Sequence, residues 1–317
     1  MSSKRPFRVG VLVMAYGTPA GSDAIEAYYT HVRRGHHPPP ELLADLQRRY
    51  SAIGGTSPLL EHTRVQAQGI QHALGRLAPG HFQVTLGMKH APPFIEAGIA
   101  ELVQQGIHRL VGLVLAPHYS TMSIGEYASR ARACCPKDHT FTIIKHWHLV
   151  SGYLDFLASS VRAAFNDLHT RQGIARADIE VLFTAHSLPT RILDMGDPYP
   201  QQLRETAEAV AARANLERWS IAWQSAGRTS EPWIGPDLLS VLYEKAQRGV
   251  AGIVVCPAGF VSEHLEILYD LDIEARRLAN QLHLAFSRTA LPHNDPRVFD
   301  ALANVVCQHL EADEIGL

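Results

Sequence analysis

Eight short apolar runs, most of them rich in valine, isoleucine and leucine, alternate along this chain with longer segments of helical periodicity. Nearly continuous apolar runs are typical of strands buried on both faces, as in a parallel sheet covered by helices. The runs cover residues 8–17, 82–90, 109–118, 141–147, 179–187, 219–227, 251–259 and 282–290. Helical patterns between them include residues 40–50, 156–171, 201–216 and 236–249. The sequence therefore predicts an α/β protein.

The eight runs divide into two sets of four with matching turn chemistry. The first run of each set ends in a turn with proline close behind, "MAYGTP" and "TAHSLP", and the second leads into "KHAPPFI" and "GRTSEPWI". The third ends at a proline before a polar helix start, "LAPHYSTMSIGEY" and "VCPAGFVSEHLEI". This correspondence predicts two similar units, residues 1–150 and 151–317, with a final helix that can pack back on the first. We expect the ligand cleft between them, beyond the carboxyl ends of the strands.

Composition excludes several classes of protein. A net charge of −2 gives no reason to expect nucleic acid as a partner. The N-terminal "MSSKRPF" runs directly into the first apolar run, which is unlike a signal peptide, and no stretch approaches the roughly 20 apolar residues of a membrane span. The four cysteines form no disulfide framework, and they predict reduced thiols in a cytoplasmic protein. They are Cys134, Cys135, Cys256 and Cys307. Nothing in the sequence demands more than a monomer.

Polar side chains that can bind metal gather where the predicted strands end. They are Tyr16, His90, His118, Tyr119, His186 and Ser187. A single histidine is more often structural, but His186 closes an apolar run and should face the crevice. Imidazole with carboxylate suits ferrous iron or zinc, or proton transfer near neutral pH. Because the chain has no H-E-x-x-H or other closely spaced ligand set, we expect any metal to be a substrate in transit.

An acidic segment, "GFVSEHLEILYDLDIEAR" at residues 259–276, follows the seventh run. If it is one helix, Glu263, Glu266, Asp270 and Glu274 share a face. This face is either an ordinary solvated surface or a string of carboxylates that passes on protons or a hydrated cation. The spacing alone leaves both possibilities open.

A basic segment surrounds a proline-broken loop near residues 30–59. Its arginines present planar forks for carboxylate or phosphate, and tyrosine and serine follow them. The glycines of "AIGGTSP" fit no Walker or dinucleotide motif. The combination suits a large, flat, acidic ligand. The residues are Arg33, Arg34, Arg48, Arg49, Tyr50 and Ser57.

Seven segments together resemble the ferrochelatases: "VLVMAYGTP", "YYTHVRRG", "RYSAIGGTSPL", "LAPHYSTMS", "TAHSLP", "WQSAGRTSEPWIGP" and "CPAGFVSEHLEILYDLDIE". They occur in the expected order from near residue 8 to about residue 300. The likeness is greatest to the monofunctional, soluble, Gram-positive type, which inserts ferrous iron into coproporphyrin III to give coproheme. The resemblance implies two chelatase-like, Rossmann-type domains, each with a four-stranded parallel sheet flanked by helices.

The resemblance also implies roles for individual residues. His186 matches the family's histidine at the metal and pyrrole-nitrogen site, and Glu266 matches its carboxylate partner across the porphyrin. Asp270 and Glu274 match an acidic ladder that leads from this site, and Tyr16 matches an axial ligand of the product iron. Further porphyrin-contacting positions are matched by Arg33, Arg49, Tyr50, Ser57 and Tyr127, of which Arg33 and Ser57 suit propionates.

Ferrous iron is then a substrate, with no permanently bound cofactor, and the cysteines match no iron–sulfur pattern of the family. The product is expected to pass to a downstream coproheme decarboxylase. Three alternatives stay open: a protoporphyrin IX ferrochelatase, a non-catalytic heme or metal carrier, and, with less support, cobalt insertion into a more acidic tetrapyrrole. The sequence does not say which of His186 and Glu266 takes protons and which delivers metal. It also leaves His36, His37, His90 and His118 without roles.

Overall fold

The computed structural model describes residues 9–315 and divides the chain into two compact units. Unit 1 comprises residues 1–116, 123–147 and 293–317, and unit 2 comprises residues 117–122 and 148–292. The main division falls after residue 147, while the C-terminal segment belongs to unit 1 and residues 117–122 belong to unit 2. The N-terminal stretch 1–8, on which the expectation about a signal peptide depends, lies outside the described residues.

The sheet of unit 1 has four parallel strands, and its first strand lies inside the sheet. All seven residues of β1 are buried, because it pairs with β2 on one side and β3 on the other. The order is β2-β1-β3-β4. The strands are β1 (Val9–Ala15), β2 (Phe82–Met88), β3 (Arg109–Val114) and β4 (Thr140–Ile144).

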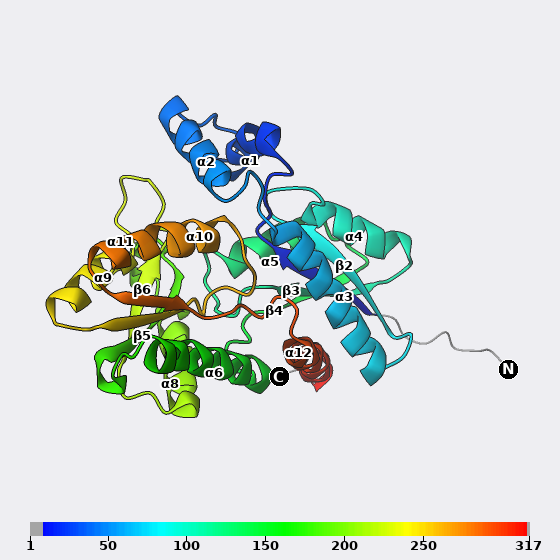
Figure 1. Cartoon of the computed structure of the whole chain (residues 1–317). Coiled ribbons are helices and arrows are strands. Elements are labelled where there is room, and N and C mark those ends of the chain that lie inside the picture. The colour runs from blue at the N-terminus through cyan, green and yellow to red at the C-terminus, as the bar shows by residue number, and fades with distance from the viewer. Residues whose placement is uncertain (1–8, 316–317) are drawn as a thin grey trace. The chain divides into compact units, whose positions relative to one another are not determined.

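Helices cover the sheet of unit 1, and two of them stand apart from it. The pair α1 (Ile25–Val32) and α2 (Pro40–Ala52) pack on each other and project away from the strands (Figure 1). The pair carries the basic segment of the sequence. The remaining elements are η1 (Ser22–Ala24), α3 (Leu59–Leu77), α4 (Ile95–Gln104), α5 (Ile124–Cys134) and α12 (Pro296–Ile315).

The sheet of unit 2 repeats the topology of the first. Its order, β6-β5-β7-β8, places the first strand of the set inside the sheet, as in unit 1, and all pairings are parallel. The predicted pair of four-stranded α/β units is thereby confirmed. The strands are β5 (Ile179–His186), β6 (Trp219–Gln224), β7 (Gly252–Cys256) and β8 (Ala285–Arg288).

The helices of unit 2 include two short π-helical segments. The elements are α6 (Ser151–Asn166), η2 (Asp167–Arg171), η3 (Arg176–Asp178), α7 (Arg191–Asp194), α8 (Tyr199–Ala214), α9 (Leu238–Gln247), α10 (Leu265–Leu268), η4 (Asp270–Ala275) and α11 (Arg276–Gln281). Both η2 and η4 are π-helical, whereas η3 is a 3-10 turn. Ile267 and Leu271 are fully buried in one apolar core with Val255 of β7. This packing orients the acidic segment, because its apolar residues face the sheet.

The acidic segment is not one α-helix, so the condition under which its acids would share a single helical face is not met. The helix starts only at Leu265, after His264 in extended conformation, so Glu263 lies in the preceding loop. Beyond Leu268 the chain widens into η4, where the Glu274 amide donates to the Tyr269 carbonyl five residues earlier. A π-turn adds a residue to the helical repeat, which changes the faces on which later side chains lie.

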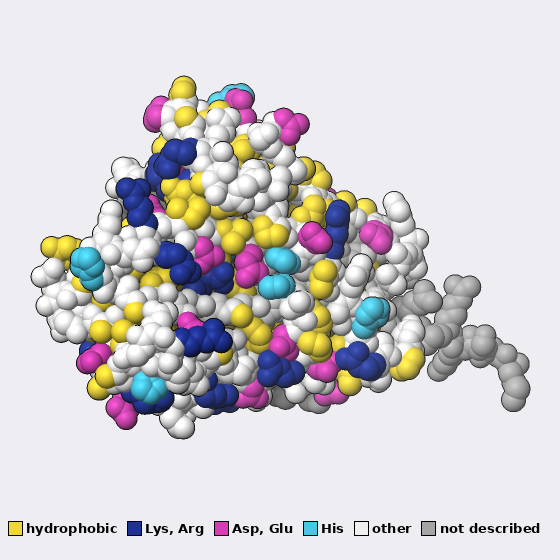
Figure 2. All heavy atoms as spheres, in the orientation of Figure 1, with side chains coloured by type: hydrophobic (Ala, Val, Ile, Leu, Met, Phe, Trp, Pro, Cys, Tyr) yellow, Lys and Arg dark blue, Asp and Glu magenta, His cyan; other side chains and the backbone are white. Residues whose placement is uncertain are grey.

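The face of the molecule seen in Figure 2 shows no dominant charge. On the face seen in Figure 2, lysine and arginine side chains are interspersed with aspartate and glutamate. This pattern agrees with the net charge of −2 and offers no continuous basic surface there for nucleic acid. Among the described residues, every helix is too short or too polar to span a membrane.

The C-terminal helix α12 packs on α3 of unit 1 through a close approach at Gly69. A methyl group added at Gly69 would overlap the ring of Phe299, whose side chain is buried. Gly75 lies on the same helix, but its surroundings are open. Gly69 is therefore a contact point for α12, and Gly75 is not.

We expect the same substitution to have opposite effects at these two positions. Gly75→Ala should raise the melting temperature, because alanine favours a helix over glycine by about 1 kcal/mol. Gly69→Ala should lower it, because displacing the Phe299 ring costs about 1–3 kcal/mol. Thermal unfolding followed by circular dichroism measures both. Equal stabilisation by the two alanines would contradict the described packing of α12.

Candidate active site

His186 is the last residue of β5, and local contacts fix the orientation of its imidazole. The Nδ1 atom lies against the Ser187 carbonyl oxygen, which leaves Nε2 to point elsewhere. The Tyr199 hydroxyl donates to the His186 carbonyl at 3.0 Å. The His186 side chain is 32% exposed, so a ligand can still reach it.

Glu266 lies in the first turn of α10 and contacts two histidines. Its Oε1 is 3.4 Å from His186 Nε2, and its Oε2 is 3.4 Å from His264 Nε2. The chain supplies these groups from two places, the end of β5 and the loop after β7. The resemblance implied that Glu266 is the partner of His186 across a bound porphyrin, and in the structure the two side chains lie in direct contact.

A close backbone approach makes this meeting possible. The Gly259 amide donates to the Thr184 carbonyl at 3.0 Å, so the loop after β7 runs directly over β5. A Cβ atom at Gly259 would lie 2.6 Å from the Ala185 Cβ. Only glycine permits this approach without displacing the loop that leads to Glu266.

The pair stabilises opposite charges on its two members. Burial alone would lower the pKa of His186, but the Glu266 carboxylate and the Ser187 carbonyl raise it to about 9. Burial alone would raise the pKa of Glu266, but His186 and His264 hold it well below its usual range. At neutral pH the pair is therefore imidazolium and carboxylate, and a cation that binds His186 must displace a proton.

These shifts contribute to stability in opposite pH ranges. The contribution of His186 is fully present below its usual pKa of 6.5 and is lost as the pH rises through about 9. The contribution of Glu266 is present above its usual pKa of 4.5 and is lost as the pH falls below that value. Between these limits both charges are retained.

Asp270 continues the acidic series and is almost fully buried, at 7% exposure. The Ser225 hydroxyl donates to its Oδ2 at 2.5 Å. The neighbouring Gln224 amide donates to the Glu266 carbonyl at 3.3 Å, and its Oε1 accepts from the Thr184 hydroxyl at 2.7 Å. Polar groups at the end of β6 thus hold Glu266 and Asp270 in place.

A buried arginine fixes the π-helical turn that carries these acids. Arg288 of β8 donates to both carboxylate oxygens of Asp272, from Nε at 2.8 Å and from Nη2 at 2.9 Å. Its Nη1 lies 3.7 Å from Glu263 Oε1, and its side chain is only 13% exposed. Glu263 therefore belongs to an ion cluster and not to the ladder.

The acidic series is not a freely solvated face. Among Glu263, Glu266, Asp270, Asp272 and Glu274, none is highly exposed. Glu274 is partly exposed and lies four residues after Asp270 in η4. Carboxylates clustered in this way attract a cation, because a positive charge relieves the repulsion between neighbouring negative charges.

Tyr16, in unit 1, follows β1 directly and has an exposed side chain. Its ring centroid lies 4.6 Å from that of His90, whose Nδ1 is 3.0 Å from His31 Nδ1. Burial, together with the charges of Lys89 and Arg130, lowers the pKa of His90 to about 3. His90 is therefore neutral at physiological pH. The Tyr16 side chain beside it is 42% exposed.

The predicted porphyrin contacts on α1 and α2 differ in accessibility. Arg33, at the end of α1, has a buried Nε without a hydrogen-bond partner among the described residues. Arg49 contacts Asp45 at 3.0 Å, and Tyr50 is only 2% exposed. Ser57 is partly exposed and its Oγ accepts from the Leu59 amide at 3.3 Å. Arg33 is thus one basic side chain here with donor capacity for a carboxylate.

Tyr127 is buried in α5 and does not present its ring to solvent. It is 4% exposed, and burial raises its pKa well above the usual value. The Lys89 ammonium lies 5.2 Å from its ring centroid and 2.5 Å from Glu126 Oε2. In the described structure Lys89 and Glu126 therefore cover Tyr127.

The structure divides the predicted site residues between the units. Unit 2 holds His186, Glu266, Asp270 and Glu274. Unit 1 holds Tyr16, Arg33, Arg49, Tyr50, Ser57 and Tyr127. The expectation that one ligand contacts both groups stays a prediction.

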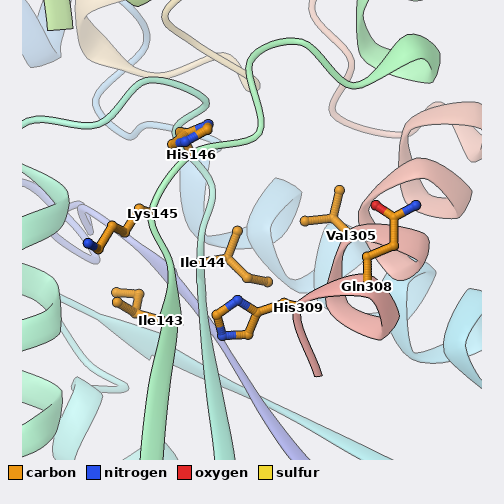
Figure 3. Close-up of a pocket in the computed structure, with 7 residues that line it drawn as sticks. All are labelled: Ile143, Ile144, Lys145, His146, Val305, Gln308 and His309. Atoms are coloured by element: carbon orange, nitrogen blue, oxygen red, sulfur yellow. The ribbon is translucent and has the colours of Figure 1, made fainter. Parts of the chain in front are cut away.

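Two other features lie outside these groups. His118 is buried in unit 2, with its Nε2 2.8 Å from the Thr206 hydroxyl, which indicates a structural role. A cavity of about 400 Å³ in unit 1 lies between the end of β4 and α12 (Figure 3). It contains none of the predicted site residues. Its lining is Ile143, Ile144, Lys145, His146, Val305, Gln308 and His309.

Sequence reasoning missed three groups at the site: His264, the Gln224–Ser225 pair and Arg288. His264 lies inside the motif "EHLE", two residues before Glu266, so its spacing gave a signal. Ser225 adopts a left-handed conformation, with φ of 60°, which the sequence does not reveal. Arg288 is 16 residues from Asp272, and only the parallel pairing of β7 with β8 brings it near.

We expect Glu266→Gln to lower the pKa of His186 from about 9. The substitution removes the carboxylate that opposes burial, so the imidazole should lose its proton at lower pH. Histidine resonances in NMR spectra titrated between pH 5 and 10 measure the change, with His186→Ala identifying the signal. An unchanged titration would show that Glu266 does not hold this charge.

We expect Arg288→Gln to loosen the segment that carries the acids. Losing two charge-assisted hydrogen bonds to a half-buried carboxylate should cost about 2–3 kcal/mol. Hydrogen exchange of amides 262–275 should become faster. The matched control is Arg276→Gln, which faces the same Asp272 from 3.7 Å with a 46% exposed side chain and should cost less than about 1 kcal/mol. Equal effects would mean that Arg288 does not fix the turn.

The chain is similar to named proteins along almost its whole length. The coproporphyrin III ferrochelatase of Anoxybacillus flavithermus is 41% identical over 311 residues, covering 96% of this chain and 97% of that protein. The protein of the same name from Geobacillus kaustophilus is 44% identical over 303 residues, covering 94% of each.

Solved structures show the same fold. The sirohydrochlorin chelatase SirB of Bacillus subtilis subspecies spizizenii, in complex with cobalt, matches with a TM-score of 0.55 at 13% identity, covering 97% of each chain. CbiX, described as the terminal enzyme for biosynthesis of siroheme in denitrifying bacteria, matches with a TM-score of 0.52 at 12% identity, covering 95% of this chain and 98% of that one. The sequence model of the ferrochelatase family matches residues 8–310. This chain belongs to the ferrochelatase family.

Proposed function

We propose that this protein inserts ferrous iron into coproporphyrin III, with release of two pyrrole protons, to form coproheme. The observation that carries the proposal is the His186–Glu266 pair, held at 3.4 Å at the end of β5 and followed by buried and half-buried carboxylates. Relatives about 40% identical along almost the whole chain are named coproporphyrin III ferrochelatases. The pair and its ladder supply what chelation needs, a metal-binding imidazole beside groups that accept protons.

The charge state of the pair defines what each residue does. His186 carries a proton at neutral pH and donates through Nδ1 to the Ser187 carbonyl, so Nε2 is the atom that exchanges a proton for iron. Glu266 is ionised and attracts a cation or accepts a pyrrole proton. Asp270 and Glu274 extend this capacity away from the pair. Which of His186 and Glu266 acts on the ring first is left to experiment.

The substrate is distinguished by its carboxylates. Coproporphyrin III carries four propionates, whereas protoporphyrin IX carries two and has apolar vinyl groups in the other positions. Arg33 supports the first substrate, because its buried Nε has no hydrogen-bond partner among the described residues. A bound propionate would complete this donor. Ser57 and Arg49 offer weaker support, since Arg49 already contacts Asp45.

We further propose that iron is substrate and that no cofactor resides in the protein. In unit 1 Cys134 and Cys135 are partly buried, and in unit 2 Cys256 is fully buried in β7, where burial raises its pKa to about 12. Such thiols are poor cluster ligands. Free cysteines also support a reducing, cytoplasmic location. We also propose that the protein is a monomer and that it passes coproheme to a decarboxylase.

The deciding experiment is anaerobic chelation followed by absorbance. Ferrous iron is offered with coproporphyrin III and with protoporphyrin IX in separate cuvettes. We expect rapid metallation of coproporphyrin III and little of protoporphyrin IX. The reverse preference would assign the protoheme reaction, and binding of both porphyrins without metallation would indicate a carrier.

His186→Ala tests the site in the same assay. Chelation should fall by about 100-fold or more, because a positioned group that exchanges protons at the reacting atoms contributes at least this factor. Porphyrin binding, followed by fluorescence quenching, should persist. His72→Asn, at an exposed histidine on α3, is the control and should behave as the unaltered protein. Full activity of His186→Ala would remove this residue from the reaction.

A further inference from the structure

A second group of metal-binding side chains lies in unit 1, at the amino ends of two neighbouring strands. His108 immediately precedes β3, and Asp138 and His139 immediately precede β4. The two strands pair in parallel with Arg109 opposite Thr140, so His108 and His139 are neighbours across the sheet. The backbone enforces this, because the Thr140 amide donates to the His108 carbonyl at 2.8 Å.

The three side chains converge. One nitrogen of each imidazole and one oxygen of Asp138 all lie within 4.8 Å of one another. The imidazole centroids are 4.4 Å apart, and His139 Nδ1 is 2.9 Å from Asp138 Oδ1. Donor atoms bound to one zinc-like ion lie roughly 3–3.5 Å apart, so small movements of the exposed His108 and Asp138 complete the set.

His139 supplies an independent sign of a ligand. Its side chain is only 5% exposed, and its Nε2 is buried without a hydrogen-bond partner among residues 9–315. A buried polar atom without a partner is costly and calls for an explanation. With its proton on Nδ1, His139 would offer the lone pair of Nε2 to an ion, and the exposed Asp138 would leave Nδ1 to join the same ion.

We propose that His108, Asp138 and His139 form a surface site for a divalent transition metal of the zinc type, separate from the active site. Two imidazoles and one carboxylate match zinc, cobalt, nickel or copper and do not match magnesium or calcium, which prefer oxygen ligands. The site lies at the amino ends of the strands, whereas Tyr16 lies at the carboxyl end of β1 in the same parallel sheet. Water completes the coordination, because His108 and Asp138 are exposed.

Binding there stabilises the edge of the unit 1 sheet. β4 is the edge strand of the sheet, and the ion would join its start to that of β3. A ligand that binds only the folded chain raises the free energy of unfolding by mass action. Zinc should therefore raise the melting temperature of the protein, and this effect should depend on His108.

The test uses zinc chloride and tag-free protein in which His186→Ala and Glu266→Gln remove the active-site ligands. Isothermal titration calorimetry measures how many zinc ions bind to each chain. The further change His108→Asn should lower this number by one relative to the matched control His72→Asn. Asp138→Asn should retain the site but weaken it about 10–100-fold, as expected for loss of a carboxylate that ligates or orients a histidine. Magnesium should give no corresponding signal.

Equal zinc stoichiometry and affinity in the His108→Asn and His72→Asn proteins would overturn the proposal. So would a melting temperature that zinc raises equally in both. With the active-site residues intact, His108→Asn should chelate iron into the porphyrin at the unaltered rate, because His108 takes no part in that reaction. A parallel loss of chelation would contradict the separation of the two sites.

Discussion

The contact between His186 and Glu266 is the interaction on which the site depends. It joins the end of β5 to the loop after β7, and it lets a carboxylate stay ionised among other carboxylates. Two histidines compensate Glu266, the Ser225 hydroxyl compensates Asp270, and Arg288 compensates Asp272. Three of the acids, Glu266, Asp270 and Asp272, thus have polar or charged partners, which explains how several negative charges are tolerated in a partly buried segment.

Much of the fold could be predicted from the sequence, because strands that are buried on both faces consist mainly of apolar residues. The continuous apolar run of β1 reports directly that both faces of the strand are covered, and all its residues are buried. Matching turns after β1 and β5 indicated the repeated topology, which the strand order confirms. The sequence left open whether α12 packs on unit 1, because contacts between segments that are distant along the chain leave no local sequence pattern.

The candidate site was predictable in part. His186 and Glu266 were identified from their motifs, and their contact follows from the parallel order of β5 and β7. The π-turn could not be predicted, because Ile267 and Leu271 keep the i, i+4 spacing of an α-helix. Tyr50 and Tyr127 match family motifs, yet both are buried in the described structure. A motif gives the residue type but not its accessibility.

The π-turn at η4 makes the acidic series sensitive to chain length. One residue of an α-helix corresponds to a rotation of about 100°. The extra residue in η4 therefore sets the direction in which the later side chains, including that of Glu274, point relative to Glu266. Removing a single residue from this segment would restore α-helical spacing and turn Glu274 away from its present face, with no change in charge. The ladder is thus encoded by the length of the segment as much as by its acids.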